Sequence, residues 1–167
     1  MGTTTLHSEG DRHTLRFERV YRHPVEEVWA AVTEPDGLAG WFPARIAYDE
    51  LAAGESMTFT FEGDDDPPTM GTITEVQPAR VLEFTWDGDP IRIELEAAGE
   101  GGEKCRVIFT NSFQGREWAV RNAAGWHICL DMLKSTLAGE QPKTPVGKRQ
   151  SQLLKEYEAQ FGGRVQG

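Results

Sequence analysis

The chain has 167 residues, of which 38% are hydrophobic and 26% are charged, an ordinary composition for one globular domain. Its formal net charge of −10 repels phosphate backbones and argues against a nucleic-acid partner. No apolar run is long enough to cross a bilayer, and the polar N-terminus lacks a secretion signal, so we expect a cytoplasmic protein with no membrane partner.

The N-terminal part of the chain contains one predicted strand. Residues 1–12 are polar and are predicted to form a flexible N-terminus, with the folded domain spanning residues 13–138. From Leu15 to Tyr21 apolar and polar residues alternate, which predicts a half-buried β-strand.

Two short helices are predicted after this strand. Pro24 suits the first turn of a helix, and the apolar residues that follow it at helical spacing predict an amphipathic helix over 24–33. Trp41 and Phe42 lie in a second short helix or turn, which Pro43 ends.

Six further strands are predicted from alternating apolar residues and from the turn residues between them. Glycine, proline and aspartate cluster in the connections, and connections this short favour an antiparallel meander. The predicted strands span residues 44–50, 56–62, 69–77, 80–86, 90–97 and 104–112.

Two helices are predicted in the C-terminal part. Residues 116–138 form a long helix that contains Gly125, either because the helix closely approaches a strand or ligand there or because a glycine is tolerated near a kink. Residues 139–147 are predicted to be a linker. An added helix over 148–162 is expected to pack on the same domain, near the first strand, or else on a second subunit. The chain is therefore predicted to be a monomer or a homodimer.

A run of strands followed by a long helix predicts an α+β fold in which the helix covers the apolar face of the sheet. The chain also carries short motifs in a fixed order: Glu18–Tyr21, Pro24–Pro35, Leu38, Trp41–Pro43, Gly54, Gly71–Pro78, Val81–Trp86, Gly125-Trp126, Leu130 and Leu133. In this order they resemble the START-like (SRPBCC) superfamily. Within it they resemble the Aha-type family, the homologues of the activator of heat-shock-protein ATPase, over about residues 14–138.

The resemblance implies a helix-grip fold, like that of the birch-pollen allergen, with a curved antiparallel sheet around a long C-terminal helix. Members of known role bind lipids, hormones or polyketides in the cavity between sheet and helix, or act as co-chaperones. The family has no shared catalytic residue, and the fold carries many functions, so the resemblance does not name a reaction.

A set of apolar side chains is predicted to converge on one cavity between the sheet and the long helix. An apolar pocket with a few polar groups is the usual form of a ligand site, although the same set also suits an ordinary hydrophobic core. The predicted ligand-binding residues are Trp41, Phe59, Phe61, Phe84, Trp86, Phe109, Trp126 and Leu130. Polar candidates at the pocket are His127, Asn122 and Arg92, together with Arg45, Thr74 and Asn111.

Two further sets of polar residues could take part in binding, catalysis or metal coordination. His127 and Asp131 are four positions apart and share a helix face, as a surface pair or as a ligand-binding or catalytic pair. Asp64-Asp65-Asp66 lacks the spacing of a calcium loop and is predicted to be a solvated hairpin tip. Because the catalytic, phosphate-binding and dinucleotide motifs are missing, we predict no catalytic residue, no cofactor and no metal.

Three functions follow from these observations. The leading prediction is a protein that binds a small apolar or aromatic molecule in an internal cavity. One alternative is a chaperone-associated stress protein, which rests on the family resemblance. The other is a polyketide cyclase- or aromatase-like enzyme in which His127, Asp131 or an arginine acts as acid or base.

Overall fold

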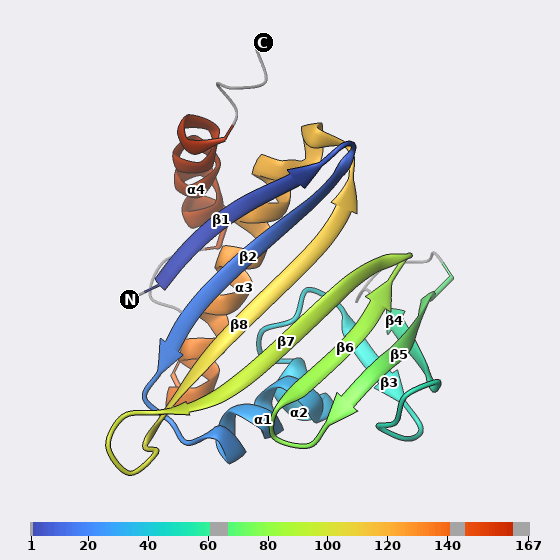
Figure 1. Cartoon of the computed structure of the whole chain (residues 1–167), viewed down its shortest axis with the longest axis vertical. Helices are drawn as coiled ribbons and strands as arrows, with labels where there is room; N and C mark the ends of the chain where they lie inside the picture. The colour runs from blue at the N-terminus through green and yellow to red at the C-terminus, as the bar shows by residue number, and fades with distance from the viewer. Residues whose placement is uncertain (1, 61–66, 141–145, 162–167) are drawn as a thin grey trace.

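A computed structural model describes residues 2–60, 67–140 and 146–161 of the chain. Within these residues, eight strands form one antiparallel sheet in the order β1-β2-β8-β7-β6-β5-β4-β3 (Figure 1). The strands are β1 (Gly2–Glu9), β2 (Arg12–Tyr21), β3 (Arg45–Tyr48), β4 (Ser56–Thr60), β5 (Thr69–Gln77), β6 (Val81–Trp86), β7 (Asp89–Ala98) and β8 (Lys104–Gln114). The helices are α1 (Val25–Thr33), α2 (Pro35–Leu38), α3 (Ala119–Ala138) and α4 (Val146–Gln160), and a 3-10 turn at Arg116–Trp118 precedes α3.

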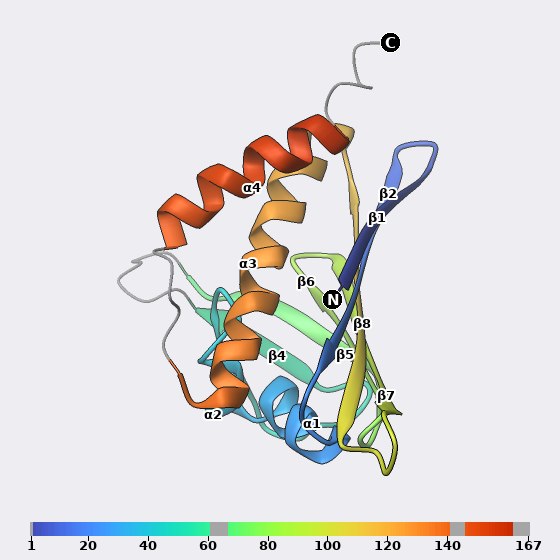
Figure 2. The ribbon, with the colours of Figure 1, turned by 90° about the vertical axis from the view of Figure 1, so that its left-hand side faces the viewer.

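The long helix α3 lies across one face of the sheet. Figure 2 shows α3 between the sheet and α4, while α1 and α2 lie near one end of the sheet. This arrangement is the predicted α+β helix-grip fold, which the structure confirms. The six strands predicted after the short helices all form, with ends within a few residues of those expected.

The core lies between the sheet and α3, and strand alternation places it there. In β8, buried and half-buried residues alternate, so that every second side chain from Cys105 to Phe113 points to the helix side. β7 does the same with Ile91, Ile93 and Leu95. These side chains form one apolar face that has to be covered, and α3 covers it.

The prediction of a flexible N-terminus over residues 1–12 is wrong. Gly2–Glu9 forms β1, which pairs with β2 in a hairpin whose turn is Gly10-Asp11. Gly10 has a φ of 60°, a left-handed conformation that glycine adopts without strain. The segment was missed because an edge strand of threonine, serine and histidine has no apolar alternation, although β-branched threonine favours strands.

The last helix packs on the same chain. It contacts α3, and Leu153, Tyr157 and Phe161 are buried. The Gln160 side-chain amide donates a hydrogen bond of 3.1 Å to the carbonyl oxygen of Thr4 in β1. The helix therefore lies against α3 and reaches β1, one strand beyond the strand that the sequence suggested.

Two glycines differ in what surrounds them. A Cβ atom added to Gly71 in β5 would collide with the carbonyl oxygen of Thr85 and lie 2.8 Å from the Phe59 ring. At Gly125 in α3, no heavy atom of the described residues lies within 4 Å of such a Cβ, apart from its chain neighbours and the backbone of its own helix turn. Close approach therefore explains Gly71 but not Gly125, so the first reason considered for Gly125 fails within the described part of the chain.

We expect Gly71→Ala to lower the free energy of unfolding by about 1–3 kcal/mol, because the added methyl overpacks the β5–β6 contact. Gly125→Ala is the matched control and should raise that free energy by about 0.4–1 kcal/mol through the reduced entropy of the unfolded chain. Urea denaturation of both variants measures the two values. If Gly71→Ala leaves the free energy of unfolding unchanged, the close approach of β5 to β6 at Gly71 is contradicted.

Candidate functional site

Aromatic rings from several elements meet between the sheet and α3. Phe59 of β4 and Trp86 of β6 stack with ring centroids 5.4 Å apart. Phe109 of β8 lies 4.8 Å from Trp126 of α3, which joins the sheet to the helix. Ring pairs at these separations attract each other beyond the burial of their area. We call Trp41, Phe42, Phe59, Phe84, Trp86, Phe109 and Trp126 the aromatic cluster.

Phe42 lies at the centre of the aromatic cluster. It comes from the connection between α2 and β3, not from the sheet or from α3. Its ring centroid lies 5.6 Å from that of Trp41, 6.1 Å from Phe59, 6.1 Å from Phe84, 5.2 Å from Trp86 and 5.5 Å from Trp126. The sequence placed Phe42 in a short helix or turn and did not include it among the site residues.

The aromatic cluster is buried except at Trp86. Trp41 is 1% exposed, and its indole N–H donates a 2.9 Å hydrogen bond to the carbonyl oxygen of Ala31 in α1. Phe59 and Phe84 have no exposed surface, whereas Trp86 is half-buried. Trp86 is therefore the part of the cluster that borders solvent.

The structure brings together six of the eight apolar site residues that the sequence selected. These are Trp41, Phe59, Phe84, Trp86, Phe109 and Trp126. Leu130 is buried one turn further along α3, where its carbonyl oxygen accepts a 3.0 Å hydrogen bond from the Tyr21 hydroxyl. Phe61 and Asp64-Asp65-Asp66 lie outside the described residues.

Among the described residues, two buried polar side chains lie on the same face of the sheet as the aromatic cluster: His13 of β2, whose ring lies 5.7 Å from that of Phe113, and Asn111 of β8. Asn111 of β8 is 4% exposed and alternates with Phe109 and Phe113, so it points to the helix side of the sheet. The Oδ1 atom of Asn111 is buried and has no hydrogen-bond partner among residues 2–60, 67–140 and 146–161. A buried amide oxygen without a partner is uncommon and costs free energy, because the group loses its water on folding.

Arg92 was selected as a possible pocket group, and this prediction is wrong. It lies between Ile91 and Ile93 on β7 and therefore points to the outer face of the sheet. There it forms ion pairs of 2.8 Å with Glu75 and 2.7 Å with Glu94. Strand alternation decides its side, because neighbouring residues on a strand face opposite ways.

The remaining polar candidates lie elsewhere. Arg45 and Thr74 are exposed, and Asn122 is half-buried on α3. His127 lies between α3 and α4 and has no contact with a ring of the aromatic cluster among its described interactions. A ligand role for His127 in the aromatic cluster therefore has no geometric support.

His127 connects α3, α4 and β1 through hydrogen bonds. The Tyr157 hydroxyl donates to Thr4 Oγ1 over 3.0 Å and lies 2.7 Å from His127 Nδ1. The imidazole thus supplies its Nδ1–H to the Tyr157 oxygen, and Nε2 accepts from Arg149 over 3.4 Å. Asp131 Oδ2 lies 3.7 Å from Nε2 and 3.6 Å from Arg149 Nε, so Asp131 and His127 lie side by side on α3 and share Arg149 as a neighbour, without a hydrogen bond between them.

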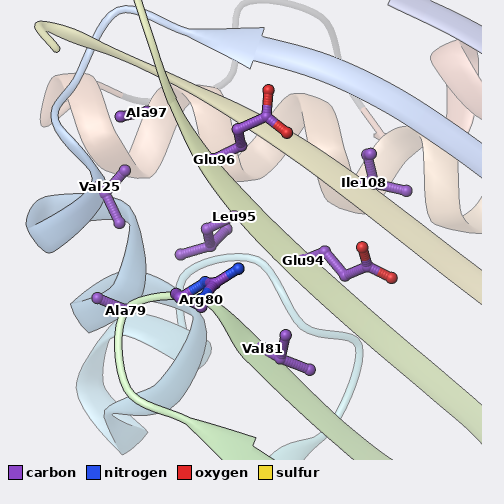
Figure 3. Close-up of a pocket in the computed structure, with 9 residues that line it drawn as sticks. All are labelled: Val25, Ala79, Arg80, Val81, Glu94, Leu95, Glu96, Ala97 and Ile108. Carbon is purple, nitrogen blue, oxygen red and sulfur yellow. The ribbon is translucent and has the colours of Figure 1, made fainter.

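A groove of about 370 Å³ lies where α1 and the β5–β6 turn meet β7 (Figure 3). It is lined by Val25, Ala79, Arg80, Val81, Glu94, Leu95, Glu96, Ala97 and Ile108. None of these residues belongs to the aromatic cluster, and three of the nine are charged: Arg80, Glu94 and Glu96. The groove is therefore a separate surface feature.

Two features are missing from the part of the chain that the structure describes. No group of three or more His, Cys, Asp or Glu side chains there is placed to hold a metal ion. No helix there is long and apolar enough to cross a membrane.

The sheet, α3 and the aromatic cluster between them define an α+β protein of the helix-grip class. Residues 22–138 match the family model described as Activator of Hsp90 ATPase homolog 1-like protein, and the match spans more than half of the chain. The chain belongs to this family. No curated protein matches the chain.

Solved structures with the same fold come from several bacteria. A conserved protein of unknown function, EF2215 from Enterococcus faecalis, is 21% identical with a TM-score of 0.74, covering 93% of this chain and 91% of its own. CalU16 from Micromonospora echinospora is 20% identical with a TM-score of 0.74, covering 99% and 96%. The protein encoded by gene BPP1335 of Bordetella parapertussis is 27% identical with a TM-score of 0.67, covering 90% and 86%. At their low identity, the first two show the fold alone.

The environment of His127 favours its neutral form. Burial is the largest cause and lowers the pKa of His127 from its ordinary value. Asp131 and Glu156 act against burial, whereas the positive charges of Arg19 and Arg149 lower the pKa further. In the unfolded chain the imidazole returns to its ordinary pKa of about 6.5.

We expect the free energy of unfolding to fall as the pH decreases from about 7 to 5, because the unfolded chain then binds a proton at His127 that the folded chain resists. His127→Gln removes this titration and should flatten that part of the curve. The measurement is urea denaturation at several pH values, with His7→Gln, an exposed histidine of β1, as control. An unchanged slope in His127→Gln would contradict the prediction.

Proposed function

We propose that this chain binds a small apolar or aromatic molecule between the sheet and α3. The observation that supports the proposal most strongly is the position of Phe42. Five other rings surround it, and they belong to α3, to the two strands β4 and β6, and to its own connection. An environment that accepts a phenyl group from a connecting segment is suited to accept a ring from a ligand.

Phe42 can leave this position without breaking the sheet. It belongs to no strand, and its neighbour Trp41 is held separately by the hydrogen bond to Ala31. A change in the Phe42 side chain alone therefore vacates a site walled by aromatic rings. The ligand competes with Phe42 for this site, so its apparent affinity is reduced by the fraction of molecules in which Phe42 stays inside.

The site would favour apolar ligands with ring systems. Its walls at Phe59, Phe84 and Trp126 offer ring faces and edges, and the burial of these side chains excludes water. Trp86, half-buried at the border of the aromatic cluster, gives a ligand a path from solvent. These features are typical of small-molecule sites, which are mostly apolar and lined by aromatic groups.

The two alternative functions have less support from the structure. A chaperone-associated role rests on the family description, and its test is a pull-down with an Hsp90-type chaperone. A cyclase-like activity needs a titrating group in the pocket, but His127 lies under α4. The aromatic cluster therefore favours ligand binding over both.

The proposal is tested by native mass spectrometry and by melting curves in the presence of fatty acids and aromatic metabolites. Retention of a molecule in the 100–400 Da range, or a rise in melting temperature that saturates with its concentration, is the expected result, since ligand sites of this kind hold molecules of about that size. A complete absence of binding and of melting shifts across the panel would overturn it.

We expect the affinity for indene, an apolar bicyclic probe, to follow the size of residue 42 in the order Ala above Phe above Trp. Phe42→Ala empties the site and should tighten binding at least tenfold, because no side chain has to leave, while costing about 3–5 kcal/mol of stability. Phe42→Trp should abolish binding. Isothermal titration calorimetry measures both.

The matched control is Phe161→Ala, an equal truncation of a buried ring that directly follows α4, stacks on Tyr157 and lies outside the aromatic cluster. It should leave the indene affinity at the value of the unchanged chain. Equal indene affinities in Phe42→Ala, in Phe42→Trp and in the unchanged chain would show that indene binds elsewhere.

A further inference from the structure

No polar side chain lies directly beside Asn111 on its face of the sheet in the described part of the chain; the nearest buried polar group in the register, His13, is diagonal to it and is hydrogen-bonded to Ser8. The register places Leu15 of β2 and Ile91 of β7 directly opposite it on its two sides. Along its own strand, the next residues on that face are Phe109 and Phe113. All four neighbours are apolar and buried, so none of them offers a donor to the unpartnered Oδ1 atom.

The helix above Asn111 carries small side chains. α3 runs in the direction opposite to β8 (Figure 1). The two elements are joined where the Phe109 ring lies 4.8 Å from the Trp126 ring. Asn111 lies two residues further along β8, a shift of about 6.6 Å, which corresponds to about one turn of α3 before Trp126. One turn before Trp126 lie Asn122, which is half-buried, and Ala123, which is buried, and among the described residues neither is a hydrogen-bond partner of Asn111 Oδ1. The buried residues of this part of α3, Ala119, Ala123 and Ala124, are small and carry no donor on their side chains.

An apolar residue would be expected at position 111 if it served packing alone. The other side chains on this face of β8 include Cys105, Val107 and Phe109, and leucine has nearly the shape of asparagine. A buried amide oxygen without a partner costs stability, so packing alone does not explain Asn111 beside the aromatic cluster. A hydrogen-bond donor carried by a ligand explains it.

We propose that Asn111 is a specificity-determining residue that accepts a hydrogen bond from the ligand. This inference rests on the proposed function, since it concerns the same site. The ligand class is then an aromatic or alicyclic molecule with one hydroxyl or ring N–H donor at one end. Its ring system occupies the position of Phe42, next to Phe84 of β6, and its donor points across Ile91 of β7 to Asn111 Oδ1 in the same row of the sheet.

The test compares indole with indene, two bicyclic probes of nearly equal shape, of which indole carries a ring N–H. The unchanged chain should bind indole about 3–10-fold more tightly than indene, as expected for one buried hydrogen bond. In Asn111→Leu, the ratio of the two dissociation constants should shift at least tenfold toward indene, because the N–H group is then buried without an acceptor.

A second readout needs no ligand. Asn111→Leu removes an unpartnered amide from an apolar environment, so its melting temperature should rise by at least about 2–4 °C. A fall in melting temperature would mean that Asn111 has an internal partner, and it would overturn the inference. Thr110→Val is the control for both readouts, because Thr110 is the adjacent residue of β8 and points to the outer face.

The outcomes separate this inference from the proposed function. If indene and indole bind equally and Asn111→Leu leaves their ratio unchanged, the role of Asn111 is refuted while ligand binding stands. If neither probe binds to the unchanged chain or to Phe42→Ala, the proposed function and this inference both fail.

Discussion

The fold depends on one constraint: the sheet has a large apolar face that water must not reach. Strand alternation creates this face in β4, β6, β7 and β8 together, and the antiparallel register brings its side chains into adjacent rows. α3 is the element that covers it. The interaction of Trp126 with Phe109 lies at the middle of this contact and joins helix to sheet.

The same contact gives the protein an interior that differs from an ordinary core. Most of its positions carry aliphatic side chains, but around Phe42 the rings gather, and at Asn111 a polar amide interrupts the apolar row. A core selected only for stability has little use for a buried amide without a partner. The two features lie on the same face, so one bound molecule can account for both.

Much of the architecture could be predicted because it depends on local patterns. The strands of the meander were found from alternation and turn residues, and the long helix from its apolar stripe. The strand β1 was missed because its stability comes from pairing with β2 and from contacts with α4, neither of which leaves an apolar period in its own sequence. For Arg92 the alternation with Ile91 and Ile93 already predicts the outer face, which conflicts with its selection as a pocket group, and the structure agrees with the alternation.

The site was predictable only in part, for a related reason. Rings on regular elements could be assigned to the inner face, but the position of Phe42 depends on the path of an irregular connection. The location of His127 depends on where α4 packs, which no residue near His127 reveals. For Asn111, alternation gives the direction of the side chain, while its lack of a partner depends on neighbours from two other strands.

Strand β1 and helix α4 are joined in the folded protein. Thr4 receives hydrogen bonds from Tyr157 and Gln160, which lie 153 and 156 positions further along the chain. Likewise β2 pairs with β8, so the first long strand waits for residues 105–114 before it gains its second neighbour. Contacts of such wide separation slow folding, because a long loop must close before they form. In a nascent chain, the edge of β2 that does not pair with β1 therefore stays open until β8 has left the exit tunnel.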